Sequence, residues 1–328
     1  MDELKFSIVV PVYNRSQEIS ELLESLAAQT DTDFEVMIME GRCNDSCKQI
    51  CSQYEDRLNI RFYIRDTGRS ERRNEGMQLA LGNYFLLFDS DCTLPKEYIA
   101  NLRKSLTENY VDCYGGPDSA NDTFTPLQLA INYSMTSIMT TGGIRGGMKD
   151  VTKYLPRAFN MGFSRKVFET TGGYLDMIGE DVDLSMRIKE AGFVVRLIPS
   201  AVVFHKRRIT LRGFYRQVKT FGKARVLLSN RHPKSLKITH LFPSAAVIGV
   251  VGLIVLALAF GNWWWLAPVV LYVVMLFVES LLKNRSIKVA FLSIPTSCCQ
   301  LGGYGIGYLD ELVTRRASHK ASETLYRQ

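Results

Sequence analysis

Two long apolar segments in the last third of the chain constrain its fold more than any other feature. Residues 241–260 carry no charged side chain, and residues 263–282 carry only Glu279. About 20 apolar residues are needed for a helix to cross a bilayer. All three tryptophans directly follow the break at Gly261-Asn262, as an aromatic belt at a membrane interface would. We therefore expect two transmembrane helices, with the lipid bilayer as a partner, rather than two buried core helices.

The basic residues around these segments predict the topology. Three precede the first segment and three follow the second: Arg231, Lys234, Lys237, Lys283, Arg285 and Lys288. The connection between the segments is uncharged. Basic residues stay on the cytoplasmic side, so we expect a multi-pass protein of the cell membrane whose soluble domain faces the cytoplasm.

The membrane region is predicted to cover residues 241–312, and a polar tail residues 313–328. Residues 289–309 are uncharged but include Pro295, Gln300 and four glycines. This third segment either spans the membrane or is re-entrant, and both alternatives stay open. Basic residues in the tail favour a cytoplasmic end.

Charge is distributed unevenly along the 328 residues. The net charge is +7, from 40 basic and 33 acidic side chains. Residues 191–278 contain 12 Lys or Arg and no acid, so the rest of the chain has 28 basic and 33 acidic side chains, or −5. Because the basic residues 206–240 directly precede the first apolar segment, we expect an interfacial linker that contacts anionic lipid head groups, not nucleic acid.

The first 205 residues show the pattern of an α/β domain. Apolar runs at 6–12, 34–39, 59–64 and 84–88 predict strands, and helical spacing at 16–29, 43–54 and 71–81 predicts helices between them. A helix at 180–191 and strands at 194–198 and 201–204 follow, whereas residues 115–150 look irregular. The alternation predicts a Rossmann-like, mostly parallel sheet with helices on both faces. Ligands of such sheets bind at the carboxyl ends of the strands.

Asp89-Ser90-Asp91 stands directly after the apolar strand 84–88. Two carboxylates at alternate positions can turn toward one point, which suits a hard divalent cation such as Mg²⁺ or Mn²⁺. Such a cation would neutralise a diphosphate as it leaves. An isolated Asp-x-Asp is more often a solvated turn, so the motif needs support from the rest of the chain.

Further motifs occur in order along the domain. They are Ser7-Ile8-Val9-Val10-Pro11-Val12-Tyr13-Asn14-Arg15, Val36-Met37-Ile38-Met39-Glu40, Gly68-Arg69-Ser70-Glu71-Arg72-Arg73-Asn74-Glu75-Gly76 and Gly179-Glu180-Asp181-Val182-Asp183-Leu184-Ser185-Met186-Arg187. As a set they resemble glycosyltransferase family 2, whose members use nucleotide-sugars and have a GT-A fold. The resemblance extends from Phe6 to about His205.

The resemblance implies roles for residues of the donor site. Pro11 and Tyr13 match the start of the nucleotide pocket. Glu40 stands where the family usually has Asp to contact the base or ribose, and Gly41 follows where many members have a second Asp. Arg73 matches an arginine that approaches the nucleotide.

It also implies the metal, catalytic and acceptor residues. Asp89 and Asp91 match the metal-binding pair, with Asp89 also next to the nucleotide and Asp91 the more direct ligand. Asp181 matches the general base. His205 is either a metal or diphosphate contact or a structural histidine.

Three residues are assigned to the acceptor side, namely Glu180, Arg216 and Gln217. The Gln-x-x-Arg-Trp motif of processive synthases is not matched, because Gln217-Val218-Lys219-Thr220-Phe221 stands in this region. We therefore expect transfer of one sugar rather than processive synthesis.

The sequence thus predicts a membrane-anchored, inverting, metal-dependent glycosyltransferase. The donor is a nucleotide-diphosphate sugar, with a UDP-sugar favoured, and the acceptor is a lipid-linked or membrane-proximal glycan. Assembly of a cell-surface polysaccharide or glycolipid is the expected setting. Two alternatives remain: transfer of one sugar to polyprenyl phosphate, and an inactive membrane-tethered scaffold.

Overall fold

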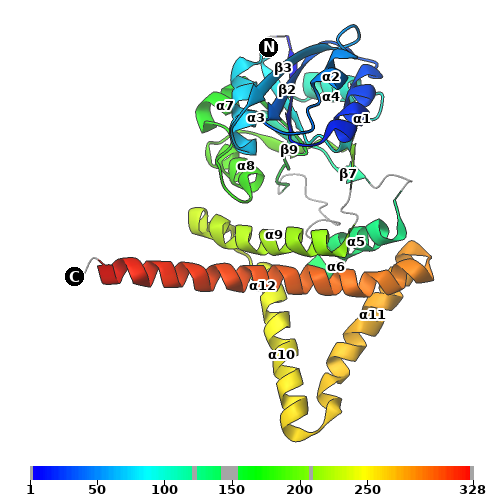
Figure 1. Cartoon of the computed structure of the whole chain (residues 1–328), viewed down its shortest axis with the longest axis vertical. Coiled ribbons are helices and arrows are strands. Elements are labelled where there is room, and N and C mark those ends of the chain that lie inside the picture. The colour runs from blue at the N-terminus through cyan, green and yellow to red at the C-terminus, as the bar shows by residue number, and fades with distance from the viewer. Residues whose placement is uncertain (1–2, 120–123, 142–153, 207–209, 326–328) are drawn as a thin grey trace. The chain divides into compact units, whose positions relative to one another are not determined.

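The computed structural model describes residues 3–119, 124–141, 154–206 and 210–325. It divides the chain into two compact units, drawn in Figure 1. The first unit comprises residues 1–121 and 149–206, and the second comprises residues 122–148 and 207–328. The sequence suggested a continuous first domain over residues 1–205, whereas residues 122–148 group with the C-terminal unit.

A seven-stranded sheet forms the centre of the first unit. Its strand order is β3 (Asn59–Arg65), β2 (Phe34–Gly41), β1 (Phe6–Val12), β4 (Tyr84–Phe88), β8 (Asn160–Ser164), β6 (Cys113–Gly115) and β9 (Val195–Leu197). Strands β3, β2, β1 and β4 are mutually parallel, while β8 runs antiparallel to both of its neighbours. The mostly parallel sheet predicted from the alternating pattern is confirmed.

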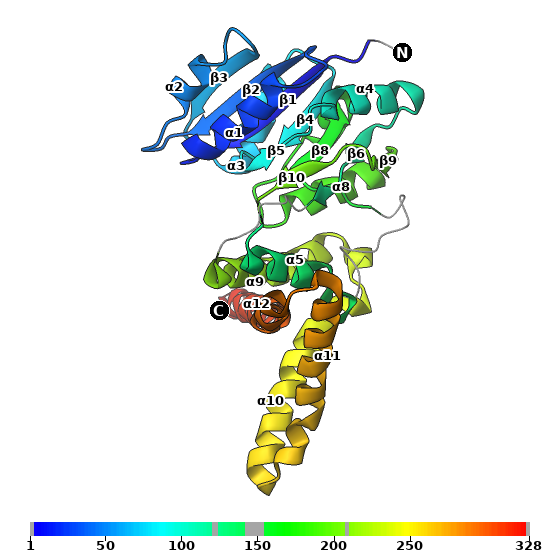
Figure 2. The ribbon, with the colours of Figure 1, turned by 90° about the vertical axis from the view of Figure 1, so that its right-hand side faces the viewer.

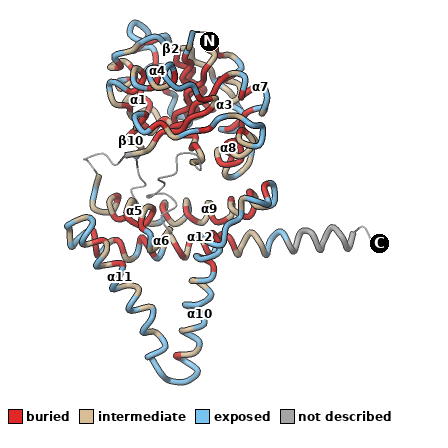
Figure 3. The backbone as a smooth tube through the Cα atoms, turned by 180° about the vertical axis from the view of Figure 1, so that it is seen from behind, coloured by how far each residue is buried: buried red, intermediate tan, exposed pale blue. Residues whose placement is uncertain are grey.

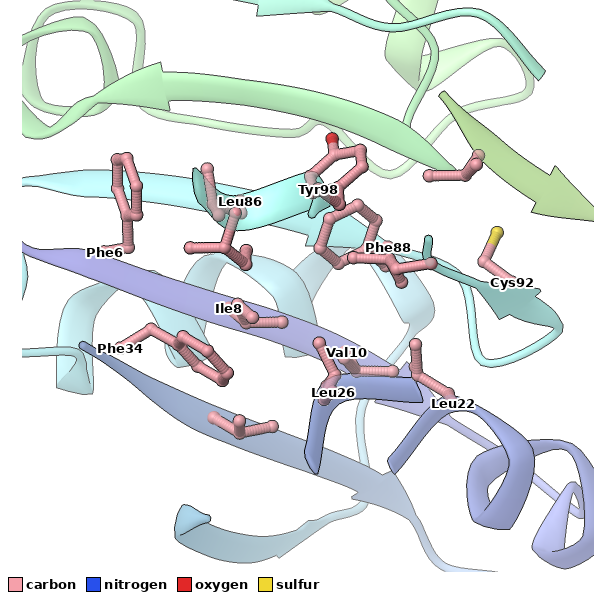
Figure 4. Close-up of a cluster of buried hydrophobic side chains, with 14 of the residues drawn as sticks. Phe6, Ile8, Val10, Leu22, Leu26, Phe34, Leu86, Phe88, Cys92 and Tyr98 are labelled. Atoms are coloured by element: carbon pink, nitrogen blue, oxygen red, sulfur yellow. The ribbon is translucent and has the colours of Figure 1, made fainter. Parts of the chain in front are cut away.

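Helices cover both faces of this sheet (Figure 2). The helices of the unit are α1 (Ser16–Ala27), α2 (Lys48–Ser52), α3 (Arg69–Leu79), α4 (Tyr98–Glu108), α7 (Arg165–Thr171) and α8 (Glu180–Glu190). Successive side chains of a strand point to opposite faces. Accordingly, Ile8 and Val10 pack with α1 and α4, as Figure 4 shows, while Val9 packs in a second core with α3, α7 and α8. Because both faces are buried, β1 reads as one continuous apolar run.

A smaller sheet lies beside the end of β4. It consists of β5 (Cys92–Thr93), β10 (Val203–His205) and β7 (Asp118–Ser119). Strand β10 pairs antiparallel with β5, so that His205 lies opposite Cys92. This pairing brings His205, near the end of the first unit, next to the Asp89-Ser90-Asp91 motif, although the two are more than a hundred residues apart in sequence.

Two local expectations from the sequence need correction. The helix expected over 43–54 is only the five residues of α2, with Cys47 as its N-terminal flanking residue. The region 115–150, which looked irregular, contains α5 (Pro126–Thr136) and α6 (Ile138–Thr141). Thr125 caps α5 by accepting a hydrogen bond from the backbone N–H of Gln128, and Pro126 occupies the first turn, where a missing N–H costs nothing.

The second unit contains α5, α6, α9 (Leu211–Arg231), α10 (Phe242–Phe260), α11 (Ala267–Asn284) and α12 (Ile287–Leu325). Short 3₁₀ turns lie at Pro233–Ser235, Ile238–His240 and Trp263–Leu266. Helix α12 packs along α9 and α5, and α10 and α11 diverge from the turn that joins them and meet α12 at their other ends (Figure 1).

Helices Phe242–Phe260 and Trp263–Asn284 are long and apolar enough to cross a membrane. Figure 3 shows that most of their surface is exposed in the isolated chain. They coincide with the two predicted spans. Residues 289–309 and most of the expected polar tail form one helix, α12, which contains Pro295 and was not anticipated as a single element.

Helix α12 approaches α9 closely because glycines line the contact. A Cβ atom added to Gly222 would lie 2.2 Å from the backbone oxygen of Tyr304 on α12. One added to Gly307 would lie 2.1 Å from the backbone oxygen of Lys219 on α9. Any larger residue at these positions would force the backbones apart.

Candidate active site

The carboxylates at the end of β4 contact residues that arrive from distant parts of the chain. His205 Nε2 lies 3.2 Å from Asp91 Oδ1. Arg15, which follows β1, places Nη1 3.3 Å from Asp91 Oδ2 and 2.9 Å from Glu18. The imidazole of His205 stacks on Phe159 with ring centroids 4.6 Å apart, which fixes its plane beside the carboxylate. Asp91 and His205, both predicted as metal ligands, are therefore brought together.

Arg73 is the centre of the site. Its side chain is fully buried, yet Nη2 lies 2.5 Å from Asp89 Oδ1 and Nη1 lies 3.2 Å from Glu180 Oε1. The ring of Tyr174 lies 5.1 Å from the guanidinium carbon, within range of a cation–π contact. One arginine on α3 thus joins the end of β4 to the N-terminus of α8.

These partners favour the charged form of Arg73. Burial by itself lowers the pKa of the guanidinium, but the carboxylates of Asp89 and Glu180, together with Tyr174, outweigh it and hold that pKa above its ordinary value. A second arginine, Arg69, donates to the same Glu180 oxygen at 2.6 Å. Glu180, expected on the acceptor side, therefore anchors two arginines of α3, a structural role that its place in the motif did not reveal.

Asp181 lies in the first turn of α8. Its Oδ1 accepts a hydrogen bond of 2.8 Å from the backbone N–H of Val182, and its Oδ2 lies 3.7 Å from Nη1 of Arg157. The carboxylate thus lies at the positive end of the helix dipole and beside a second cation. The side chain is one-fifth exposed, so a substrate can reach it. Its role as general base stays a prediction.

The residues expected around the nucleotide lie at the carboxyl ends of β1 and β2. Pro11 and Val12 pair in register with Met39 and Glu40, and Tyr13 follows with more than half of its side chain exposed. Glu40 is buried: Oε1 accepts from the N–H of Cys47 at 2.7 Å, and Oε2 accepts from Ser46 at 2.6 Å. In this arrangement Glu40 holds the loop after β2, and its contact with a base or ribose stays a prediction.

The donor atoms near Asp91 fit a divalent cation in part. Asp91, Cys92 and His205 each place one potential ligand atom within 4.8 Å of the others. A carboxylate oxygen and an imidazole nitrogen suit Mn²⁺ or Mg²⁺. Cys92 is a poor ligand for either, because burial raises the pKa of its thiol well above the ordinary value and Sγ already contacts the Phe159 carbonyl. Asp89 is engaged with Arg73 instead.

The remaining acceptor-side residues belong to the other unit. Arg216 and Gln217 lie on α9, with Arg216 exposed and Gln217 half-buried. Their assignment stays a prediction. Sequence reasoning missed Arg15, Arg69 and Arg157, whose partners are carboxylates of the site. Arg15 and Arg69 stood inside recognised motifs but were given no role there, whereas no local pattern around Arg157 could have identified it.

Comparison with known proteins agrees with this arrangement. Residues 7–172 match the profile of glycosyl transferase family 2. A 114-residue stretch, 33% of this chain, is 34% identical to the poly(ribitol-phosphate) beta-N-acetylglucosaminyltransferase TarS of Staphylococcus aureus but covers only 20% of that protein. The glycosyltransferase AglE of Haloferax volcanii is 22% identical over 220 residues, or 62% of this chain and 67% of AglE.

Structural comparison identifies the same fold. The mannosyltransferase PcManGT from Pyrobaculum calidifontis superimposes with a TM-score of 0.64 and 16% identity, covering 91% of this chain and 87% of the other. The profile match extends from β1 to the end of α7 and takes in the Asp89-Ser90-Asp91 motif and Arg73, so about half of the sequence carries it. This chain belongs to glycosyl transferase family 2.

Proposed function

We propose that the protein transfers a sugar from a nucleotide-diphosphate sugar to a hydroxyl acceptor with inversion at the anomeric carbon. The observation that carries this proposal is the ion-pair network of Arg73, which joins Asp89 at the end of β4 to Glu180 at the start of α8. Through it, an Asp91–His205 pair suited to a diphosphate-bound metal and an accessible carboxylate, Asp181, belong to one connected site.

The reaction makes two chemical demands. The acceptor oxygen forms a bond to the anomeric carbon while the bond to the diphosphate oxygen breaks, and the hydroxyl proton passes to a base. Asp181 is the proposed base, because its carboxylate is accessible and lies beside Arg157. A single base on the face opposite the leaving group gives inversion, and no nucleophilic second carboxylate is required.

The leaving diphosphate needs positive charge. Asp91 and His205 would hold Mg²⁺ or Mn²⁺, and the ion would supply Lewis-acid stabilisation of the departing phosphate. PcManGT is described in complex with GDP-Man and Mn²⁺, which supports both the cofactor and the class of donor. TarS, by its name, acts on poly(ribitol-phosphate), which supports a glycan-type acceptor. A UDP-sugar remains the favoured donor.

The two long apolar helices support a place at the membrane. We propose that α10 and α11 anchor the chain in the cell membrane as a multi-pass protein and that the catalytic unit faces the cytoplasm. Basic residues flank both helices, and the connection between them is uncharged, as the positive-inside rule requires. Anchoring would hold the site near lipid-linked acceptors.

Purified full-length protein in detergent tests the proposal. We expect release of nucleoside diphosphate from one of a panel of nucleotide-sugars when Mn²⁺ and a lipid extract are present, and a new lipid-linked product by mass spectrometry. The mass of that product distinguishes a glycan acceptor from polyprenyl phosphate. Asp181→Asn should bind the donor normally but turn over roughly 10²- to 10⁴-fold more slowly. Normal turnover of this variant would refute the assignment of the base, and no turnover with any donor would favour the scaffold.

A further inference from the structure

Arg72, which precedes Arg73 on α3, has no acidic partner among the residues that the structure describes. Arg72 is 7% exposed, and its head group lies between the end of β2 and Tyr13. A Cβ atom added to Gly41 would lie 2.6 Å from Arg72 Nη1 and 2.8 Å from a ring carbon of Tyr13. Any side chain at position 41 would therefore require the guanidinium or the Tyr13 ring to shift from this place.

The hydrogen bonding of Arg72 is incomplete. Its Nη1 donates to the carbonyl oxygen of Thr67, while its Nε is buried without a hydrogen-bond partner within the described part of the chain. Neighbouring Arg69 and Arg73 both pair with Glu180, but no ion pair of Arg72 is seen among the described residues. A buried donor without an acceptor costs free energy, which a ligand acceptor would recover.

The charge of Arg72 is also uncompensated. Burial, followed by repulsion from Arg69 and Arg73, lowers the pKa of the guanidinium. A cation held in this way gains from any negative or strongly polar acceptor that arrives. Arg15, Arg69, Arg73 and Arg157 each pair with a carboxylate of the site, whereas the described part of the chain offers Arg72 only the carbonyl oxygen of Thr67. Arg72 can therefore accept a further partner from a bound ligand.

The position of Arg72 narrows the class of that group. Arg72 and Gly41 lie at the carboxyl ends of the parallel strands, on the side of Tyr13, where the proposed function places the nucleoside of the donor. The diphosphate side of the site is at Asp91 and His205, after β4. The exposed ring of Tyr13 offers a face on which a base can stack, directly beside the guanidinium.

Resting on the proposed function, we propose that Arg72 reads the base of the donor nucleotide by donating hydrogen bonds to a ring carbonyl oxygen. Arginine donates and never accepts, so it favours a base with a carbonyl acceptor, as in uracil or guanine. Adenine presents an amino group at the corresponding position of its ring and offers no carbonyl. Gly41 supports this role, because the absence of a side chain at position 41 leaves space for the Arg72 guanidinium.

Calorimetric titration of purified full-length protein with Mn²⁺ tests this inference with UDP, GDP, ADP and inorganic pyrophosphate as probes. Arg72→Met keeps the apolar stem and removes the donors, so the better of UDP and GDP should bind about tenfold or more weakly. Affinity for pyrophosphate should change by less than about twofold, and the ratio of the affinity for UDP or GDP to the affinity for ADP should decrease. Gly41→Ala keeps the charge but displaces the guanidinium and should give the same pattern. Arg57→Met, at an exposed arginine paired with Glu24, is the matched control and should change nothing.

Each remaining outcome is decisive. An equal loss for pyrophosphate would place Arg72 on the phosphates and overturn the inference. Unchanged binding of UDP and GDP by both variants would make Arg72 a structural residue and also overturn it, while the proposed function would stand. If the wild-type protein binds no nucleoside diphosphate, the proposed function and this inference fail together.

Discussion

Replacing Arg73 by methionine should destabilise the first unit through its buried charges. The guanidinium is fully buried and contacts Asp89 at 2.5 Å and Glu180 at 3.2 Å. Removing one partner of a buried ion pair costs about 3–5 kcal/mol, because the remaining charge stays desolvated and unpaired. Glu180 keeps a second cation, since Arg69 lies 2.6 Å from it, but Asp89 loses its partner in this network. We therefore expect the lower end of that range, about 3 kcal/mol.

Pulse proteolysis of the full-length protein across a urea series measures this loss. Tryptophan fluorescence is unsuitable, because all three tryptophans lie at 263–265 in the second unit. Arg73→Lys, which keeps the charge but not the two-pronged geometry, should lose less than Arg73→Met. Arg57→Met removes an exposed arginine from the same unit and should stay within about 0.5 kcal/mol of the wild type. If Arg73→Met unfolds at the same urea concentration as Arg57→Met, the network does not stabilise the fold as argued.

Three further perturbations test other parts of the structure. Asp91→Ala should weaken Mn²⁺-dependent donor binding by more than the roughly tenfold that losing an outer-shell partner costs, and unchanged Mn²⁺ dependence in a donor titration would disprove its role as ligand. Burial raises the pKa of Glu35, but hydrogen bonds from Ser7, the Leu81 N–H and other donors outweigh it and leave that pKa below its ordinary value. The stability that Glu35 contributes is therefore fully present above its unfolded pKa and is lost as pH falls below it. In urea denaturation, the difference in unfolding free energy between wild type and Glu35→Gln should become smaller from about pH 5 toward pH 3. A difference that stays constant with pH would contradict this. Gly222→Leu should push α9 away from α12 and lower the stability by about 1–3 kcal/mol, measured by thermal unfolding with thiol labelling as the readout. Gly249→Leu, whose added side chain would meet open space, should leave the stability unchanged. Equal melting temperatures of the two variants would contradict the close contact.

Local sequence determined much of the fold and part of the site. The strands of the parallel half, the helices α1 and α3 between them and the two apolar helices follow from periodicity, because burial on both faces of a sheet or in a membrane leaves a strong one-dimensional pattern. The Asp89-Ser90-Asp91 motif and the segment around Arg73 could also be recognised, because each is a short local pattern: the first follows the end of a strand, and the second lies within one helix. The helix over residues 126–136 was missed because its polar and glycine-rich surroundings conceal the cap at Thr125.

What only the tertiary structure decided are the contacts between residues far apart in sequence. Arg73 and Glu180 are separated by 107 residues, and the pairing of β10 with β5 alone brings His205 to Asp91. The space beside Gly41 belongs to Arg72 for a similar reason: a missing side chain on one strand admits a charged one from a helix packed against it. A sequence pattern records which face of an element is buried, but it does not record which distant charge that face meets. The sequence thus specified the elements and the family, and the packing of β1, β4, α3 and α8 specified the site.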